Sequence, residues 1–229
     1  MRRLKNEVLQ VLIDDAFDTR LPALLQIPGR RIVNPLFAFL LHPKPMVRWR
    51  AVVAMGAVVS QLADTALESA RVVIRRMMWQ LNDESGGIGW GCPEALGECV
   101  ARHASIADAY HRILVSYLDP CRNYLEHPML QQGLLWGVGR AVHSRPGQLA
   151  GWGHLLLPHL DAEDPQRRGL AAWAAGAAGD TALLPTLRRL SDDDQLFEFF
   201  DGSRLTRLPV KEMATAAAAR LESSVVPNS

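Results

Sequence analysis

The sequence has few cysteines, no dominant charge and no long apolar run. Its three cysteines, Cys92, Cys99 and Cys121, are irregularly spaced, which argues against a disulfide framework. The formal net charge of +1 gives no general attraction to nucleic acid or anionic membranes. No apolar run reaches the roughly 20 residues of a membrane span, and none follows the basic start as in a secretion signal. We therefore expect a cytoplasmic protein with no membrane partner.

Strand-type patterning is also scarce. Apolar residues recur at intervals of three and four without sustained alternation, and turns containing proline or glycine interrupt them. An apolar share of 48% over 229 residues is enough for a sizeable core. The pattern predicts an all-α fold.

A repeat organises the expected helices. Four apolar segments align on a shared glycine, and a weaker fifth copy covers 210–222. The glycines are Gly56, Gly97, Gly139 and Gly176, separated by 41, 42 and 37 residues. The apolar segments that precede the five copies lie at 34–41, 68–81, 107–118, 151–160 and 181–190. Each unit is thus a helix pair, and stacked helix pairs form an α-solenoid in which small residues allow close approach.

The first copy resembles the second helix of a HEAT repeat. Val47 and Arg48 follow a turn and lead through small residues to Gly56, whereas the second copy has Gly89 at the arginine position. Similar units occur in phycobilin lyases and many bacterial proteins. Over residues 34–222, the resemblance implies a right-handed α-solenoid of about five helix pairs in a bacterial protein. It also implies that Arg48 pairs with an acidic residue of an adjacent repeat.

This organisation sets the expected boundaries. We predict a helical cap at 1–33, repeats at about 34–65, 66–104, 105–145, 146–180 and 181–222, and a disordered tail at 223–229. The acidic stretch 191–202 is predicted to be the last connection between repeats, with its phenylalanines covering the end of the core.

The stretch 81–91, LNDESGGIGWG, is unusually long for a turn inside a repeat. As a phosphate loop it lacks the lysine and Ser/Thr of a P-loop, and Asp83 and Glu84 would repel phosphate. As a structural turn, Asn82 ends one helix, the paired glycines take positive φ, and Pro93 lies in the first turn of the next helix. As a functional turn, it presents Asn82, Asp83 and Glu84 to a ligand.

Residues four apart share a helix face, which groups side chains of the second helices into one candidate binding surface. Its members are Trp49, Trp90, Glu94, Glu98, Trp136, Arg140 and Trp173. In the HEAT family the second helices usually line the concave surface, so the resemblance implies docking there. The tryptophans would give apolar contact, the glutamates would accept hydrogen bonds from a cationic group, and Arg140 would balance their charge.

The alternative for the same residues is structural. The tryptophans would fill the core between repeats, Glu94 would stabilise a helix N-terminus, and Glu98 would pair with Arg102. Similarly, the stripe formed by Cys92, Cys99 and His103 has the residue types of a metal site, but both cysteines replace small or apolar residues of other copies. We expect no metal and no cofactor.

These patterns predict a non-catalytic binding or scaffold module whose partner is a protein segment, with a small-molecule ligand as an open alternative. An enzyme is the second hypothesis, either like alkylpurine DNA glycosylases or like bilin lyases that handle a tetrapyrrole. Cations and aromatics interleave at 48–50 and 75–79, as in nucleic-acid grooves, but no strongly basic stripe is present. Nucleic acid is therefore not expected as a partner, and we assign no catalytic residue.

Overall fold

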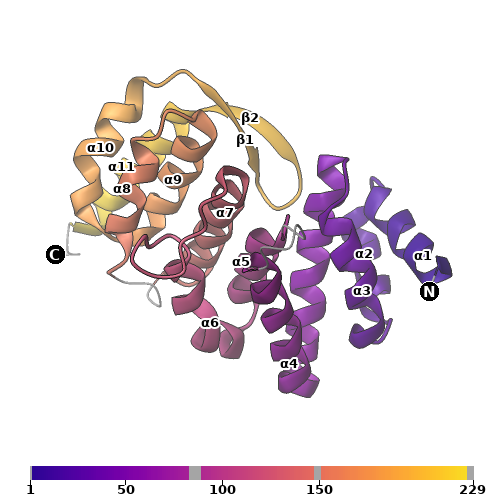
Figure 1. The fold of residues 1–229 in the computed structure, drawn as a ribbon. Helices are drawn as coiled ribbons and strands as arrows, with labels where there is room; N and C mark the ends of the chain where they lie inside the picture. Colours follow the sequence, from indigo (N-terminus) through magenta and orange to yellow (C-terminus); the bar gives the residue numbers. More distant parts are fainter. Residues whose placement is uncertain (1, 83–88, 147–150, 226–229) are drawn as a thin grey trace. The chain divides into compact units, whose positions relative to one another are not determined.

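The computed structural model describes residues 2–82, 89–146 and 151–225. The chain divides into two compact units (Figure 1). Unit 1 consists of Met1–Tyr110 with Phe200–Arg204, and unit 2 of His111–Phe199 with Leu205–Ser229. The elements are helical apart from one two-stranded hairpin, so the predicted all-α class is confirmed with that exception.

Unit 1 contains two N-terminal helices followed by helices that pack on one long helix. Its elements are α1 (Arg2–Ile13), α2 (Phe17–Leu25), α3 (Gly29–Leu40), α4 (Pro45–Leu81), α5 (Cys92–Arg102) and the first part of α6 (Ala104–Ser116). The buried face of α3 follows helical spacing through Ile32, Leu36 and Leu40, and α3 and α5 both pack on α4. The helices α1 and α2 occupy the predicted N-terminal cap.

Helix α4 joins two predicted repeat helices. Its backbone leaves the helical region at Ala66, with φ −155° and ψ 69°, which coincides with the predicted start of the second repeat. By length and composition α4 is the one candidate membrane span among the residues that the structure describes, but 61% of its most apolar window is buried. That burial is the pattern of a core helix.

The long turn after α4 has the predicted ends. Asn82 caps α4, and Pro93 lies in the first turn of α5. Gly91 has φ +74°, and a Cβ there would lie 2.9 Å from the carbonyl oxygen of Leu40, so only glycine fits. The predicted contributions of Asp83 and Glu84, and of the paired glycines, lie outside the described residues.

Unit 2 differs from the predicted pairs of long helices. Its helices are α7 (Pro128–Ser144), α8 (Leu157–Leu160), α9 (Pro165–Ala178), α10 (Leu184–Arg189) and α11 (Val210–Val225). The segments 151–160 and 181–190, predicted as full helices, instead combine short 3₁₀ turns with the brief helices α8 and α10. Each brief helix has a proline in its first turn, where the missing N–H is tolerated. Helix α11 extends past the predicted start of the tail at 223.

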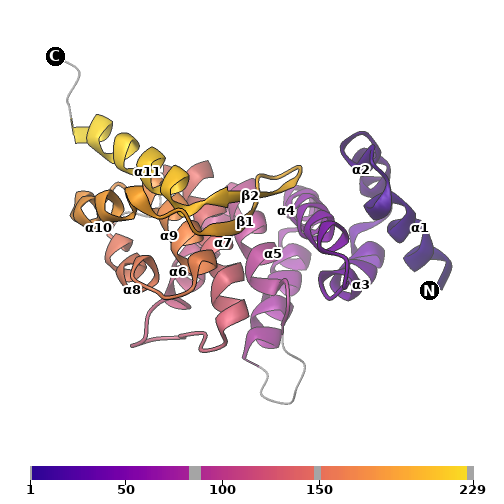
Figure 2. The same ribbon diagram turned by 90° about the horizontal axis from the view of Figure 1, so that it is seen from above.

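The predicted connection at 191–202 includes the first strand of a β-hairpin, which is made of β1 (Leu196–Phe200) and β2 (Leu205–Pro209). Asp201 closes its turn by accepting hydrogen bonds from the N–H groups of Ser203 and Arg204, at 2.8 and 2.9 Å. The hairpin runs beside α9, where Phe197 contacts Gly169 (Figure 2). The prediction that the phenylalanines cover a core is confirmed, because Phe197, Phe199 and Phe200 are all buried.

Three of the repeat glycines lie directly against the next second helix. A Cβ on Gly139 would lie 2.5 Å from the Trp173 ring, and one on Gly176 would lie 3.1 Å from the backbone of Ala217. In unit 1, a Cβ on Gly56 would lie 2.5 Å from Cγ of Glu98. Small residues at this repeat position therefore make room for the next second helix, as the alignment predicted.

Candidate functional site

The predicted surface residues divide between the units. Unit 1 contains Trp49, Asn82, Trp90, Glu94 and Glu98, and unit 2 contains Trp136, Arg140 and Trp173. Asp83 and Glu84 lie outside the described residues. The idea that all of these side chains form one surface stays a prediction, as does the role of Arg140 as counter-charge to the glutamates.

The two tryptophans of unit 1 differ in exposure. Trp49 is buried and stacks on Phe200, with ring centroids 4.7 Å apart and planes inclined by 13°. Trp90 is half-buried just before α5. Trp49 therefore belongs to the packed interior of unit 1, and Trp90 retains surface for contact with a partner.

Glu98 is held inside unit 1. Its side chain is only 2% exposed, forms an ion pair with Arg102 one turn later on α5, and rests in the space left by Gly56. The structure thus contains the predicted Glu98–Arg102 pair. A partner cation would have to share a carboxylate that already has a counter-charge.

Glu94 has an unused acceptor. It is the third residue of α5, where negative charge is favourable, and it accepts a hydrogen bond from its own backbone N–H. Its Oε2 is buried and has no hydrogen-bond partner among the residues that the structure describes. Burial raises the pKa of Glu94, and the positive charge of Arg48 partly opposes this rise.

Arg48 has an unused donor. Its Nε is buried and has no hydrogen-bond partner within the described part of the chain. Arg48 lies in the first turn of α4, which packs against α5, and it is the cation that acts on Glu94. A buried donor or acceptor without a partner costs about 1–3 kcal/mol, so each of these two groups lowers the stability of the folded protein as it stands.

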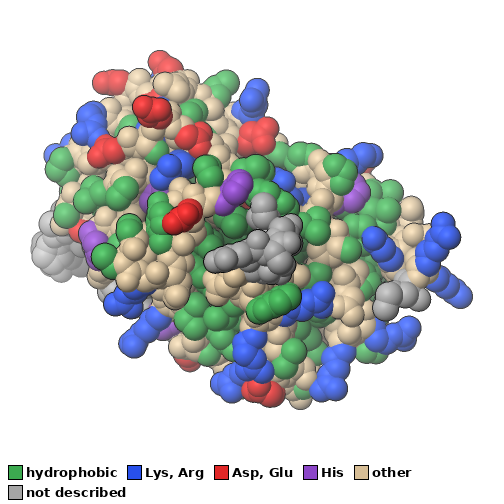
Figure 3. All heavy atoms as spheres, viewed as in Figure 1, with side chains coloured by type: hydrophobic (Ala, Val, Ile, Leu, Met, Phe, Trp, Pro, Cys, Tyr) green, Lys and Arg blue, Asp and Glu red, His purple; other side chains and the backbone are tan. Residues whose placement is uncertain are grey.

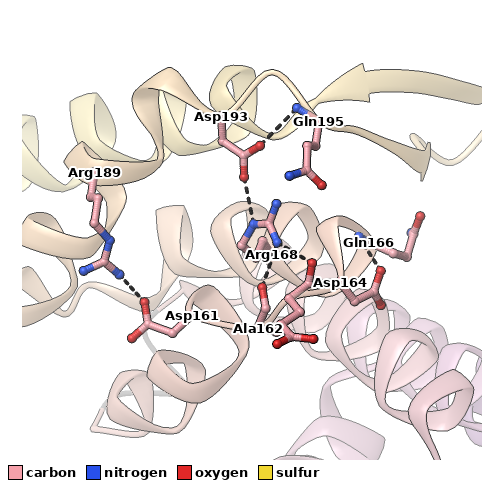
Figure 4. A network of polar contacts seen from close by, with 9 residues as sticks. Asp161, Ala162, Asp164, Gln166, Arg168, Arg189, Asp193 and Gln195 are labelled. Atoms are coloured by element: carbon pink, nitrogen blue, oxygen red, sulfur yellow. Dashed lines mark hydrogen bonds and ion pairs between the residues drawn. The ribbon is translucent and has the colours of Figure 1, made fainter.

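The equivalent arginine of the fourth repeat donates hydrogen bonds from two of its nitrogens (Figure 4). Arg168 donates from Nε to Oδ2 of Asp193 at 2.7 Å, and from its Nη1 atom to the carbonyl oxygens of Ala162 and Glu163, each at 2.7 Å. At the same repeat position, Nε of Arg168 in unit 2 therefore has a hydrogen-bond acceptor, whereas Nε of Arg48 in unit 1 has none among the described residues.

Sequence reasoning treated Arg48 as structural and missed it as a site residue. A signal was present in the alignment. Asp193 lies 25 residues after Arg168, and the residue 25 positions after Arg48 is Val73, whose side chain cannot accept a hydrogen bond. Nε of Arg48 has no acceptor among the described residues, so the expectation that Arg48 pairs with an acid of an adjacent repeat stays a prediction.

The tryptophans of unit 2 form an aromatic cluster. Trp136 is 1% exposed, and its ring lies 6.2 Å from that of Trp173. His143 stacks on Trp173 at 4.9 Å, and Phe199 meets it edge-on at 4.9 Å. Burial lowers the pKa of His143, so it is neutral at pH 7. A binding role for Trp136 and Trp173 stays a prediction, since both rings serve packing here.

Cys92 and Cys99 behave as core residues. Both are buried, and Cys92 donates to Oε1 of Gln80 at 3.1 Å. Burial, with the nearby charge of Glu94, raises the pKa of Cys92 to about 12, and burial raises that of Cys99 further. Both thiols are therefore protonated at neutral pH. Within residues 2–82, 89–146 and 151–225, no cluster of three His, Cys, Asp or Glu has the arrangement of a metal site.

No protein-family model matches the chain. A protein of Archaeoglobus fulgidus, described as uncharacterized, is 24% identical over 186 residues, or 81% of this chain and 94% of that protein. An engineered protein matches 97% of this chain and 98% of its own, with a TM-score of 0.52 and 15% identity. A designed armadillo repeat protein in complex with the peptide (KR)4 matches 95% and 99%, with a TM-score of 0.50 and 16% identity.

This chain has the helical-repeat fold of armadillo proteins. The predicted α-solenoid class is therefore confirmed. At this level of sequence identity, similarity to the solved structures shows only the fold. The function of this helical-repeat protein has to be argued from its side chains. The relative is archaeal, so the expected bacterial origin stays a prediction.

Proposed function

We propose that this helical-repeat protein is a non-catalytic scaffold that holds a segment of a partner protein against the first turns of α4 and α5. The observation that carries the proposal is the pair of buried, unpartnered atoms on these neighbouring helices, Nε of Arg48 and Oε2 of Glu94. Hydrogen-bonding groups left unpaired in a folded protein are costly, and they mark positions where a ligand would complete the set.

A polypeptide segment can supply both the hydrogen-bond acceptor that Nε of Arg48 lacks and the donor that Oε2 of Glu94 lacks. A backbone carbonyl accepts from Nε of Arg48, and a lysine or arginine side chain donates to Oε2 of Glu94. Trp90, which is half-buried and four residues before Glu94 in the chain, would provide apolar contact for the stem of that side chain. The partner is therefore a segment that carries a basic residue.

Two further points support this proposal. The designed armadillo protein of similar fold binds (KR)4, a peptide with the same cationic chemistry. The protonated thiols of Cys92 and Cys99 do not favour covalent attachment of a tetrapyrrole. In the described part of the chain, we find no observation that favours the glycosylase-like alternative over a binding role.

Labelled synthetic peptides test the proposal by fluorescence anisotropy. The probes are a peptide of alternating lysine and arginine and the same peptide with glutamate at every basic position. We expect the wild type to bind only the basic peptide, and Glu94→Gln to weaken binding about tenfold or more. Arg48→Met should weaken it as well.

The matched control is Glu222→Gln, which removes an exposed carboxylate from α11 in unit 2. It should leave affinity unchanged. Equal binding by the wild type and Glu94→Gln, or equal binding of the two peptides, would rule out recognition at Glu94.

A further inference from the structure

A second surface lies between α3 and the part of α4 after Ala66. It is a groove of about 470 Å³, a volume in the range of ligand pockets. Its walls include Arg30 and Asn34 of α3, and Ser69, Val72, Val73 and Arg76 of α4. All of these residues belong to unit 1. The floor is apolar, and a guanidinium group stands on each side.

The two arginines of the groove have only neutral hydrogen-bond partners. Arg30 donates to Oγ of Ser69 at 2.7 Å, and Arg76 donates to Oδ1 of Asn34. Arg76 also lies over the Phe37 ring, 4.1 Å from its centroid. Among the described residues, neither guanidinium has a carboxylate partner, so both positive charges are uncompensated.

The one acid at the groove is already neutralised. Glu68 pairs with Arg75 at 2.6 Å and with Arg71 at 3.6 Å. These two arginines lower its pKa, so it remains ionised and paired. Figure 3 shows the result on the surface, where Lys and Arg side chains gather over the lower part of α4 with hydrophobic side chains between them. The groove therefore attracts negative charge.

An apolar stripe extends the groove along α4. Val72 is 54% exposed and Trp79 is 66% exposed, the highest value among the large hydrophobic side chains that the structure describes. Seven residues apart, they lie on one helix face about 10 Å from each other. The Trp79 side chain has neither a ring contact nor a hydrogen bond within the described residues. A stripe of this length suits an elongated occupant better than a compact one.

We propose that this groove binds an acidic, amphipathic segment of a partner protein. Apolar side chains of the segment fill the groove over Val72 and Val73 and cover Trp79. Its carboxylates pair with Arg30 and Arg76, which present planar donors suited to bidentate contact. This is helix-in-groove recognition, in which an amphipathic helix lays its apolar face into a hydrophobic groove. The site is separate from Arg48 and Glu94 and prefers partners of the opposite charge.

Two synthetic helical peptides test this inference. Both are about 16 residues long and carry leucine at helical spacing, one with glutamate and the other with lysine at the flanking positions. In the Glu94→Gln background, which removes the site of the proposed function, we expect the glutamate peptide to bind and the lysine peptide not to bind in an anisotropy titration. Arg30→Gln and Trp79→Ala should each weaken binding about tenfold or more, since arginine and tryptophan dominate interface energetics.

Matched controls come from unit 2. Arg122→Gln alters an arginine whose side chain is 69% exposed, and Met129→Ala truncates an apolar side chain of a residue that is 51% exposed. Both should bind like the wild type. Arg76→Lys keeps the charge but loses the planar contact, so it should bind with intermediate affinity. Circular dichroism and thermal unfolding of each variant separate lost binding from lost folding.

Three results would overturn the inference. They are equal affinity for the two peptides, unchanged affinity in Arg30→Gln and Trp79→Ala, and binding of laurate with no binding of the glutamate peptide. The last result would assign the groove to a small amphipathic acid. Because Glu94→Gln should leave binding of the glutamate peptide intact, failure here is distinguishable from failure of the proposed function.

Discussion

At the scale of single residues, one repeat position serves two purposes. Arg168 is buried and donates hydrogen bonds to Asp193 and to two backbone carbonyls, which fixes the start of α9. Arg48 occupies the same repeat position, and its buried Nε has no acceptor among the described residues. The hydrogen bonds of Arg168 serve stability, whereas the proposed function requires a partner to supply the acceptor that Nε of Arg48 lacks.

Glu94 should lower stability while it supports binding. Burial raises its pKa in the folded state, so the folded protein keeps this proton at pH values where the unfolded chain has released it. Stability therefore falls as the pH rises from the ordinary carboxyl pKa of 4.5 through the folded pKa. We expect Glu94→Gln to be more stable than the wild type at pH 8, and nearly equal to it at pH 5, in urea unfolding.

Glu222→Gln, at an exposed position, should follow the wild-type pH dependence throughout. A lower stability of Glu94→Gln at pH 8 would mean that the ionised carboxylate is satisfied in the folded state.

The Arg168 network gives a second residue-scale prediction. Asp193→Asn removes the counter-charge of a buried arginine and should lower the free energy of unfolding by about 3 kcal/mol or more. Asp161→Asn is the matched control, because Asp161 pairs with Arg189 where both side chains are more than half exposed. Its effect should be below about 1 kcal/mol. Similar losses in the two variants in chemical denaturation would contradict the assignment of Arg168 as a buried anchor.

At the scale of elements, helix spacing depends on which side chain faces each glycine. Gly139 of α7 faces the Trp173 ring of α9, whereas Gly176 of α9 faces Ala217 of α11. A ring held between His143 and Phe199 has little freedom to move aside. The same glycine position therefore tolerates a methyl group to different degrees in different repeats.

A double-mutant cycle measures this packing. Gly139→Ala places a Cβ about 2.5 Å from the Trp173 ring and should cost roughly 1–3 kcal/mol through overpacking. In the Trp173→Leu background the same change should cost much less, because the ring is gone. Additive losses in thermal unfolding would show that the ring does not limit the approach of α7 and α9.

At the scale of the whole molecule, the hairpin is divided between the two units. Phe199 packs on Trp173 in unit 2, whereas Phe200 belongs to unit 1 and stacks on Trp49. Successive side chains of a strand point in opposite directions, which allows neighbouring residues of β1 to serve different cores.

Hydrogen exchange should resolve these separate contributions. Phe200→Ala, which removes a fully buried ring, should speed amide exchange mainly in α4 around Trp49. Phe199→Ala should speed exchange mainly in α9 around Trp173. The two variants serve as controls for each other. Uniform acceleration over all helices in both would indicate one cooperative unit in place of two.

Much of the architecture was predictable because it depends on local periodicity. Helical spacing of apolar residues predicted the helices, and the recurring glycines predicted the close approach of second helices. The hairpin was missed because LFEFF is a short run in an acidic segment, and its pairing depends on a turn closed by Asp201. The short helices α8 and α10 were predicted too long because apolar spacing alone does not fix where 3₁₀ turns replace an α-helix.

By itself, the sequence determined the helical-repeat fold, the positions of its small residues and the types of side chain available for binding. These properties follow from spacing along the chain. The tertiary structure alone decided which polar groups were left over. Glu98 pairs with Arg102, and Arg168 pairs with Asp193. Nε of Arg48 and Oε2 of Glu94 have no hydrogen-bond partner in the described chain. Arg30 and Arg76 have only neutral hydrogen-bond partners there. Whether a charged side chain has a partner of opposite charge depends on residues that are distant in sequence and that packing brings together.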